Sequence, residues 1–296
     1  MKIYRHLDHK LNPCILTIGN YDGIHIGHQA LLDKLVDEAK KFQIDSALMT
    51  FEPHPKEFFN KQDAPTRIVS LREKLEFFKK RGINRVYLIR FDKKFSEITG
   101  DQFLTVLKAK INVKKIIVGK DFRFGKNRAA SIEDLREALI EVIEIKAIEH
   151  NQIRVSSTMI RESLDAADFQ TAAALLGRPY EISGVVRHGR KIGREIGFPT
   201  ANIHMFHKRP ALKGVFAVKL GGLYGVANLG LRPTFLNDSL LSLEVHLFNF
   251  DQNIYGKHVR VEFVEKLRDE AKFNSVEDLK QQIQEDIKKA KEIFNI

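Results

Sequence analysis

Two histidines that enclose a glycine stand near the start of the chain, directly after an apolar run. The run "CILTI" (14–18) leads into "GNYDGIHIGH" (19–28), in which His25 and His28 lie on either side of Gly27. A metal site, a phosphate-binding loop and a tight turn all fit this grouping. Zinc sites need three or four ligands, and no cysteine or additional histidine stands at ligand spacing here. A turn explains the glycines, which permit positive φ, but it gives the histidines no role.

Phosphate binding explains more of this stretch. Gly27 stands where the next helix is expected to begin, so free N–H groups and the positive end of the helix dipole face the loop. A small residue lets a phosphate approach, and imidazole N–H groups can stabilise charge that builds on phosphoryl oxygens. We therefore favour a phosphate site at His25, Gly27 and His28.

A second glycine-rich stretch, "HGRKIGREIGFPTANI" (188–203), combines Gly189, Gly193 and Gly197 with "PTAN". It is not a Walker A loop, because no Gly-Lys-Ser/Thr stands in the required register. A glycine-rich hairpin would explain the glycines but would not call for "PTAN".

Glu244 is the only carboxylate in the strand-like run "LSLEVHLF" (241–248). Period-2 alternation puts it on one face with His246, which we expect at the surface, and puts the leucines and valine on the other. A carboxylate beside a bound hydroxyl can accept its proton during phosphoryl transfer. From these residues alone we favour the other interpretation, an ordinary outward-facing residue.

The elements that must position these residues change in kind along the chain. Up to about residue 150, apolar runs alternate with helical patterns, which predicts a parallel sheet with helices on its faces. We expect strands at 14–19, 46–51, 85–91, 115–119 and 141–148, and helices at 28–42, 70–82, 99–111 and 131–140. Ser70 and Glu73 are expected to form a capping box, and Ser131 is expected to cap the last of these helices. Ligands of such sheets bind beyond the carboxyl ends of the strands, which is where "GNYDGIHIGH" lies.

The second half has another rhythm. Residues 155–177 are predicted to be helical, with a break near Ala166 and Asp168. Short β-like runs separated by glycines and polar turns then predict an antiparallel barrel or sandwich, closed by a helix that starts near Ser275. The expected fold is therefore α/β, with a Rossmann-like domain over residues 1–177 and a small antiparallel β-barrel domain with a terminal helix over 178–296.

Composition sets broad limits. The chain has 296 residues, 43% of them hydrophobic, and a formal net charge of +11. Such a surplus of positive charge is consistent with nucleic-acid binding or with substrates that carry phosphates. Solvated helix faces explain most of the lysines. One cysteine, Cys14, fits a reduced cytoplasm. No apolar stretch reaches the length of a membrane span and the N-terminus lacks a signal-peptide core, so we expect a soluble, cytoplasmic protein.

Four blocks of the first half together resemble a known family. "GNYDGIHIGH", "TFEPHP" (50–55), "VGKDFRFGKNRA" (118–129) and "VSSTMIRESL" (155–164) are similar to the adenylyltransferase half of bacterial bifunctional riboflavin kinase/FAD synthetases. Tyr21 stands where phenylalanine is commoner, and Ala130 stands where glycine is usual. The resemblance implies transfer of AMP from ATP to FMN, which yields FAD and pyrophosphate.

The resemblance also implies roles for individual residues. His25 and His28 become catalytic, and the ATP contacts are Gly19, Asp22, Gly27, His28, Ser157, Thr158 and Arg161. The flavin contacts are Asp121, Phe122, Phe124 and Arg128. Packing beneath a loop is the plainer explanation for the two phenylalanines, and a helix cap would explain Ser157 or Thr158 but not Arg161.

Four blocks of the second half resemble the riboflavin kinase of the same family: "GFPTAN" (197–202), "GVANLGLRPTF" (225–235), "LSLEVHLFNF" and "YGKHVRVEFVEKLRDEAKF" (255–273). By this resemblance Thr200 and Asn202 hold the Mg²⁺ of ATP, with Gly193 and Thr200 at the nucleotide. Glu244 becomes the general base on the ribityl 5′-hydroxyl of riboflavin, and Arg268 helps to close the flavin pocket. Phe216 replaces the usual tyrosine, which we interpret as a packing change.

Two other classes of protein remain as alternatives. An aminoacyl-tRNA-ligase-like protein shares the His-x-Gly-His element, but its tRNA-binding domain has no counterpart in the predicted barrel. A flavin-sensing regulator that does not turn over is the second. The leading hypothesis predicts ATP, riboflavin and FMN as ligands, FMN and FAD as products, no nucleic acid, no membrane, and a monomer or weak homo-oligomer.

Overall fold

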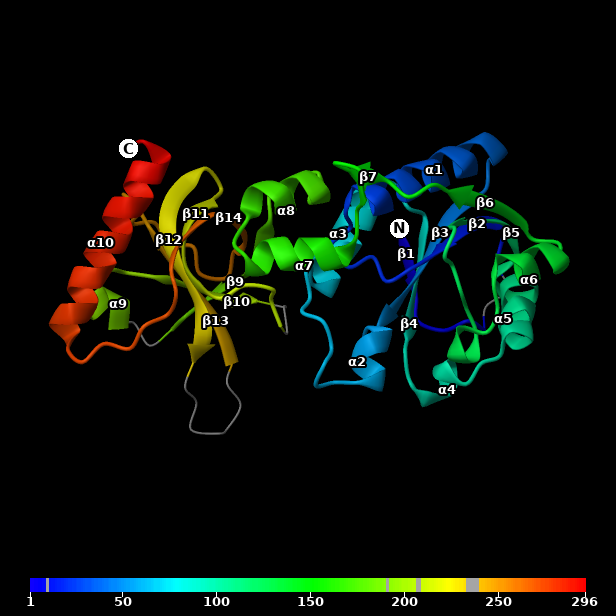
Figure 1. Ribbon diagram of the computed structural model, residues 1–296, viewed down its shortest axis with the longest axis horizontal. Helices are drawn as coiled ribbons and strands as arrows, with labels where there is room; N and C mark the ends of the chain where they lie inside the picture. Colours follow the sequence, from blue (N-terminus) through cyan, green and yellow to red (C-terminus); the bar gives the residue numbers. More distant parts are fainter. Residues whose placement is uncertain (9–10, 190–191, 206–208, 233–239) are drawn as a thin grey trace. The chain divides into compact units, whose positions relative to one another are not determined.

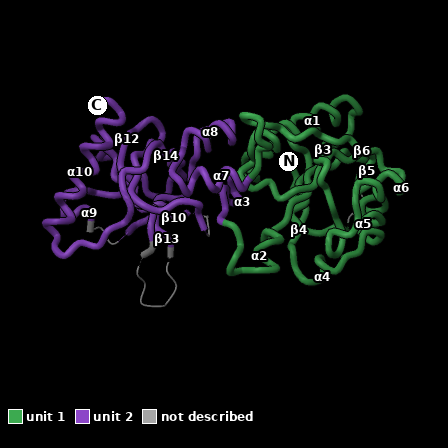
Figure 2. The backbone as a smooth tube through the Cα atoms, viewed as in Figure 1, with its two compact units in different colours: residues 1–65, 74–156 green, residues 66–73, 157–296 purple. Residues whose placement is uncertain are grey.

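The computed structural model of the chain describes residues 1–8, 11–189, 192–205, 209–232 and 240–296. Its contacts form two compact units, one of residues 1–65 and 74–156 and one of residues 66–73 and 157–296 (Figure 2). Packing thus groups residues 157–177 with the second unit. The division by activity at residue 177 stays a prediction.

The first unit is built on a parallel six-stranded sheet, as the alternating pattern predicted (Figure 1). The strand order is β1-β4-β3-β2-β5-β6. The bounds are β1 Lys2–Tyr4, β2 Cys14–Ile18, β3 Asp45–Glu52, β4 Arg85–Arg90, β5 Val113–Gly119 and β6 Glu141–Ile145. The order of connection reverses between β2 and β5, so the loops after these two strands flank the switch point at which such sheets bind ligands.

Helices cover both faces of this sheet. One face, with Leu16, Met49 and Ile116, packs against Leu107 and Leu135 of the helices that follow β4 and β5. Helix α1 packs against β2, β3 and β5. The helical segments are α1 Ile26–Phe42, α2 Pro55–Phe59, α3 Leu71–Lys80, α4 Lys93–Ser96, α5 Gly100–Val106, the π-helical turn Leu107–Ile111, the 3₁₀ turn Lys126–Arg128 and α6 Ile132–Glu137. A short pair, β7 Glu149–His150 and β8 Ile153–Arg154, follows β6.

Local signals in the sequence account for several of these ends. The Ser70 N–H donates to Glu73 Oε2 (2.7 Å) and the Glu73 N–H to Ser70 Oγ (3.3 Å), which is the predicted capping box at the start of α3. Gly82, just after α3, has φ +79°, which glycine adopts without strain. The expected helix over 99–111 is real, but its last turn is π-helical.

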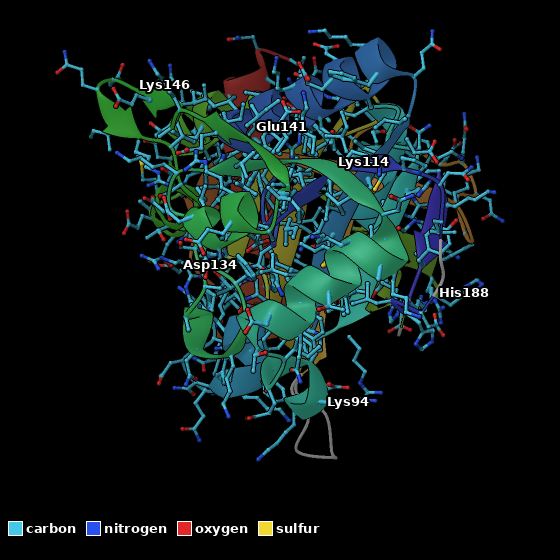
Figure 3. All side chains as sticks on the ribbon, turned by 90° about the vertical axis from the view of Figure 1, so that its right-hand side faces the viewer. Lys94, Lys114, Asp134, Glu141, Lys146 and His188 are labelled. Atoms are coloured by element: carbon cyan, nitrogen blue, oxygen red, sulfur yellow. The ribbon has the colours of Figure 1, made fainter. Side chains whose placement is uncertain are left out.

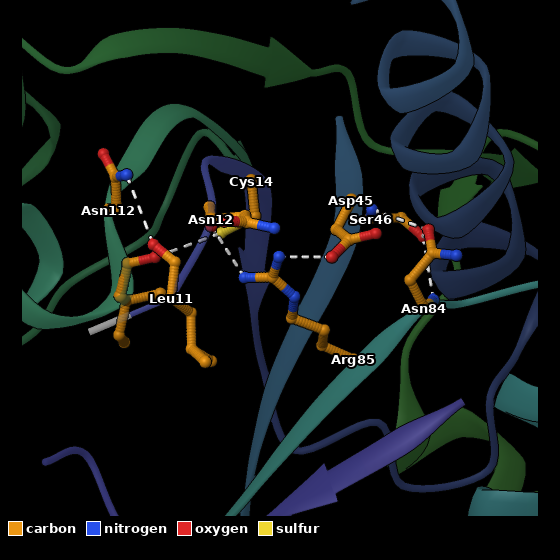
Figure 4. Close-up of polar contacts among 9 residues, drawn as sticks. Leu11, Asn12, Cys14, Asp45, Ser46, Asn84, Arg85 and Asn112 are labelled. Carbon is orange, nitrogen blue, oxygen red and sulfur yellow. Dashed lines mark hydrogen bonds and ion pairs between the residues drawn. The ribbon is translucent and has the colours of Figure 1, made fainter. Parts of the chain in front are cut away.

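Polar contacts close the amino ends of the strands (Figure 4). The Asn84 side-chain oxygen accepts from Ser46 Oγ (2.8 Å), and Arg85 pairs with Asp45 while it donates to the Asn12 carbonyl (2.8 Å). A cavity of about 520 Å³ at the amino ends of the strands is bordered by Asn12, Asp45, Ser46 and Asn84, whereas the predicted phosphate loop follows the carboxyl end of β2. Because these polar groups are hydrogen-bonded to or paired with one another, we assign the amino end of the sheet a structural role.

The second unit contains a closed antiparallel barrel, so the alternative of a sandwich is excluded. The strand order is β10-β13-β12-β11-β14-β9. The bounds are α7 Ser157–Asp165, α8 Phe169–Leu176, β9 Glu181–Arg187, α9 Ile192–Glu195, β10 Ala201–Met205, β11 Gly214–Leu220, β12 Leu223–Arg232, β13 Leu240–Leu247, β14 His258–Arg268 and α10 Val276–Phe294. Strand β10 was not predicted, although "ANIHM" alternates as a strand does.

Two predictions for this unit hold at the level of single residues. The break between α7 and α8 falls at residues 166–168, where Ala167 has φ +56° and Asp168 caps α8. Ser275 caps α10, as predicted. Helix α10 packs on β11, β12 and β14 (Figure 1). Its Ala290 belongs to a buried cluster with Val215, Ala217 and Val226.

Charged side chains lie mostly at the surface. In the first unit Lys94, Lys114 and Lys146 are exposed (Figure 3), which agrees with solvated faces as the main reason for the lysines. In the part of the chain that the structure describes, no helix is both long and apolar enough to cross a bilayer.

Candidate active sites

The first candidate site is the loop from β2 into α1. His25 caps α1, and its Nδ1 accepts the His28 N–H (3.3 Å), which leaves the proton of a neutral His25 ring on Nε2. The two rings stack with centroids 3.8 Å apart. A Cβ on Gly27 would lie only 3.2 Å from the His25 ring, so the glycine lets that ring fold over the start of the helix. The spacing of His25, Gly27 and His28 thus has a structural reason.

Electrostatics keep the His28 ring neutral. Burial, then the neighbouring His25 and then the Lys74 ammonium, hold the pKa of His28 well below its usual value. Its Nδ1 is buried, with no hydrogen-bond partner among the described residues. The loop therefore presents a neutral His28 ring together with the N–H groups and positive dipole end of a helix N-terminus, which suit phosphate oxygens.

The loop has an unusual backbone. Tyr21 (φ +51°) and Ile24 (φ +46°) are left-handed, a conformation that costs on the order of 1–3 kcal/mol for such residues. Tyr21 is 1% exposed, and its hydroxyl lies 2.8 Å from Thr17 Oγ1. The tyrosine therefore adds a buried hydrogen bond that a phenylalanine would lack. Asp22 is also buried, at 2% exposed.

The loop after β5 carries the predicted flavin contacts. Phe124 is 7% exposed and belongs to the core, whereas Phe122 is half-buried and stacks on it with centroids 5.8 Å apart. The packing explanation therefore applies to Phe124, and Phe122 is the ring closer to solvent. Asp121 pairs with Arg154, and Arg128 is exposed.

Ala130 fits this loop. It is 6% exposed, and its backbone exchanges hydrogen bonds with that of Phe124 (3.0 and 3.1 Å). Its methyl group faces Gly100, where any added Cβ would lie 2.8 Å away. Alanine in place of the family's usual glycine at residue 130 thus fills space beside Gly100, and the backbone hydrogen bonds with Phe124 are kept.

Phenylalanines beyond the predicted pair extend along this region. Their rings form an unbroken series of contacts, with centroids 5.2 to 6.3 Å apart, in the order Phe59, Phe58, Phe91, Phe51, Phe95, Phe103, Phe124 and Phe122. Phe59 at one end is 69% exposed. In the sequence, this series of rings corresponds only to the composition, with 21 phenylalanines and no tryptophan, which does not show which rings meet.

The helix α7 carries the remaining predicted ATP contacts of the first half. Ser157 and Thr158 are its first two residues, and Arg161 follows one turn later. This helix belongs to the second compact unit, in which Arg161 Nε donates to the Thr66 carbonyl (2.7 Å). Their part in ATP binding stays a prediction.

The second candidate site is a cavity of about 340 Å³ in the second unit. It brings together all the residues predicted for the kinase: Gly193, Thr200, Asn202, Glu244 and Arg268. Apolar side chains line much of the rest, from Ile196 and Phe198 on one side to Phe273, Leu279 and Ile283 near and on α10. The polar side chains of Asn228, Glu270 and Asp286 also line it. His246 also lines it, with Nδ1 2.8 Å from the Pro199 carbonyl oxygen, so its expected surface position is the rim of a cavity.

Strand register explains how Glu244 reaches this cavity. In β13 it lies opposite Asn202 of β10 on one side and Asn228 of β12 on the other. Leu243 and Val245 are buried on the opposite face at 0% and 1% exposed. Glu244 therefore does face outward from the barrel wall, but this stretch of wall borders the cavity. Asn228 was not singled out from the sequence, because only the register puts it beside Glu244.

Two glycines lie in close contact with the chain around Thr200 and Asn202. A Cβ on Gly189 would lie 2.3 Å from the Asn202 amide nitrogen, and one on Gly193 would lie 2.5 Å from the Phe198 carbonyl oxygen and 3.3 Å from Thr200 Oγ1. These glycines let the chain lie directly on Thr200 and Asn202. The hydroxyl and amide oxygens of this pair are hard donors of the kind that Mg²⁺ takes together with water and phosphate.

Arg268 is tied to the terminal helix. Its Nε and terminal nitrogen donate to the Asp286 carboxylate at 2.8 to 3.0 Å, and Asp286 is 2% exposed. The guanidinium also lies 5.6 Å from the Phe273 ring centroid. Asp286 was missed from the sequence, where it is one of several acids of a charged helix. Phe216 is fully buried and packs against Phe169 and Phe263, as the packing interpretation predicted.

Comparisons with known proteins find relatives for both halves of the chain. A family model described as FAD synthetase matches residues 7–159, and one described as riboflavin kinase matches residues 176–294. A bifunctional riboflavin kinase/FMN adenylyltransferase of Haemophilus influenzae is 44% identical over 297 residues, 96% of each chain. Its namesake from Escherichia coli is 40% identical over 96% of this chain and 93% of its own. The crystal structure of a macrolide-efflux protein from Streptococcus pneumoniae is 31% identical and covers 97% of this chain and 96% of its own, with a TM-score of 0.79.

These matches confirm the resemblance drawn from the motifs. Both family models match in order, and the relatives align over nearly the whole chain. The chain belongs to the bifunctional riboflavin kinase/FMN adenylyltransferase family.

Proposed function

We propose that residues 178–296 phosphorylate riboflavin to FMN and that residues 1–177 adenylylate FMN to FAD, with ATP as the donor in both steps. The observation that carries this proposal is that the residues expected for the kinase line one cavity in the second unit. The histidine loop belongs to the parallel sheet of the first unit. The names of the relatives support the same pair of reactions.

For the kinase, the neighbouring positions of Asn202, Glu244 and Asn228 on three adjacent strands support a division of roles. Asn202 and Thr200 would hold Mg²⁺, and the ion would neutralise charge on the transferring phosphoryl group. Glu244, between Asn202 and Asn228, would take the proton of the riboflavin 5′-hydroxyl as its oxygen attacks the γ-phosphorus and ADP leaves. The apolar lining with Phe273 suits the flavin ring, and Arg268 borders it.

For the adenylyltransferase, the loop supports catalysis by positioning and charge stabilisation. A phosphate oxygen of FMN would attack the α-phosphorus of ATP, and the bond to pyrophosphate would break. Imidazole N–H groups of His25 and His28 and the first-turn N–H groups of α1 would stabilise the charge that develops, while Gly19, Asp22 and Gly27 shape the loop. Phe122, with Asp121 and Arg128, would contact the flavin, and Ser157, Thr158 and Arg161 would contact ATP.

One incubation tests the proposal. The purified protein, riboflavin, ATP and Mg²⁺ should yield FMN and then FAD, with ADP and pyrophosphate as co-products, separated by chromatography. FMN supplied in place of riboflavin should yield FAD without ADP. Absence of both flavin products would contradict the proposal, and tight flavin binding without turnover would favour a regulator.

A further inference from the structure

Lys74 is a buried cation that the proposed chemistry does not yet use. It lies on α3 and is 1% exposed, and its ammonium donates to the Asn20 carbonyl (2.8 Å) in the loop after β2. Lysine is seldom fully buried, because removing its charge from water is costly.

The helix α3 supports the loop at more than this one point. Phe78, four residues after Lys74 and thus on the same helix face, packs edge-on against the Tyr21 ring with centroids 5.5 Å apart. Arg81 just beyond α3 donates to Gln29 Oε1 (2.8 Å), and Gln29 Nε2 donates to the Ile24 carbonyl (2.9 Å).

These contacts meet the loop where its backbone is strained. Two of them reach the left-handed residues Tyr21 and Ile24, and the third reaches Asn20 beside Tyr21. Strained backbone persists only where its surroundings hold it. The face of α3 that carries Lys74 and Phe78 is therefore part of what keeps the histidine loop in shape.

We propose that Lys74 is a positioning residue of the adenylyl-transfer site, which holds the Asn20 carbonyl and supplies a fixed positive charge behind the loop that carries His25 and His28. This inference rests on the proposed function of that loop. The charge has a second effect on the same loop. The titratable groups described against the His28 ring are Tyr21 and His25 of the loop and Lys74 of α3. After burial and His25, Lys74 is the third cause that lowers the pKa of His28.

The sign of the resulting pH dependence follows from that cause. The ordinary pKa of histidine is about 6.5. A lowered pKa keeps the His28 ring neutral when the pH falls below that value. Without the Lys74 charge the pKa of His28 rises, so the ring becomes protonated at a higher pH. The acidic limb of FAD formation should then move toward neutral pH.

Three variants test the inference. Lys74→Met keeps most of the unbranched side chain but removes the ammonium group, and with it the charge and the hydrogen bond. Lys79→Met is the matched control, because Lys79 lies on the same helix and is exposed. Phe78→Leu weakens the ring contact with Tyr21 but keeps the charge, so it separates packing from electrostatics.

In Lys74→Met we expect kcat/KM for FAD formation from FMN and ATP to fall on the order of 10²-fold, since small misplacements at a reacting centre cost about that much. Its acidic limb should shift upward, while FMN formation from riboflavin by the same molecules is unchanged. Phe78→Leu should lower the melting temperature and leave the acidic limb in place. Lys79→Met should match the wild type.

The outcomes distinguish this inference from the proposed function. If the wild type forms no FAD, the proposed function fails. If the wild type forms FAD and Lys74→Met retains its rate and pH profile, only the role of Lys74 is overturned. Upward movement of the acidic limb in Phe78→Leu to the same extent as in Lys74→Met would also overturn it, because packing alone would then explain the effect.

Discussion

The two candidate sites are built in opposite ways. In the first unit, His25, Gly27 and His28 come from ten consecutive residues at the end of one strand, and helix α1 begins within them. In the second unit, Asn202, Glu244 and Asn228 come from three strands that only the barrel brings into register. The first site depends on local backbone geometry, which the face of α3 that carries Lys74 and Phe78 supports. The second depends on correct strand pairing, since a slip by one residue would turn Glu244 to the other face.

This contrast has an energetic counterpart. The loop site contains left-handed residues, a buried lysine and a neutral histidine, which are costs at the place where phosphates are expected. The cavity site instead uses regular strands, glycines that allow close approach and an Arg268–Asp286 pair to the terminal helix. We therefore expect substitutions at the two sites to have separable effects on the two activities.

Glu244→Gln should produce the largest effect. It keeps the size of the side chain but removes the group that would accept the riboflavin proton, so FMN formation should fall by about 10²–10⁴-fold. FAD formation from supplied FMN should not change, as measured by flavin chromatography. Glu262→Gln is the matched control, since Glu262 lies on β14 and pairs with Lys219 away from the cavity lining. An equal loss of both activities in folded Glu244→Gln protein would show that the sites are not separate.

His28→Ala should have the reverse effect. Loss of one donor to a developing phosphoryl charge costs about 10²–10³-fold in comparable sites, so FAD formation should fall by that order. FMN formation should continue, and FMN should accumulate from riboflavin. His6→Ala, at an exposed histidine of the same unit, should behave as the wild type. Normal FAD formation in His28→Ala would remove this histidine from the site.

A pair of glycine variants should give the smallest effects and the finest comparison. Gly189→Ala would force the Asn202 side chain to move, because the added Cβ lies 2.3 Å from its amide nitrogen. We expect the KM for Mg–ATP in FMN formation to rise about tenfold, equivalent to one lost hydrogen bond of about 1.4 kcal/mol. Gly27→Ala needs a shift of only a few tenths of an ångström in the His25 ring, so FAD formation should fall less. Each variant is the control for the other, and a reversed pattern would contradict both site assignments.

Much of the fold followed from local patterns. Caps at Ser70, Ser131 and Ser275, the break before Asp168 and alternating apolar runs each act over a few residues, so the sequence predicted them correctly. Strand β10 was missed because five residues after a glycine-rich stretch carry a weak signal. The choice between barrel and sandwich was open because strand pairing is non-local.

The sequence alone determined that the chain has an α/β half with a phosphate-type loop and a β-rich half with a second glycine-rich motif, and it identified the family through its motifs. Those features are contiguous, and spacing along the chain is sufficient to recognise them. Tertiary structure alone decided that Asn228 flanks Glu244, that Asp286 holds Arg268, and that Lys74 lies buried beneath the histidine loop. Each of these pairs joins separate elements, and their proximity depends on strand register and helix packing, which leave no local trace in the sequence.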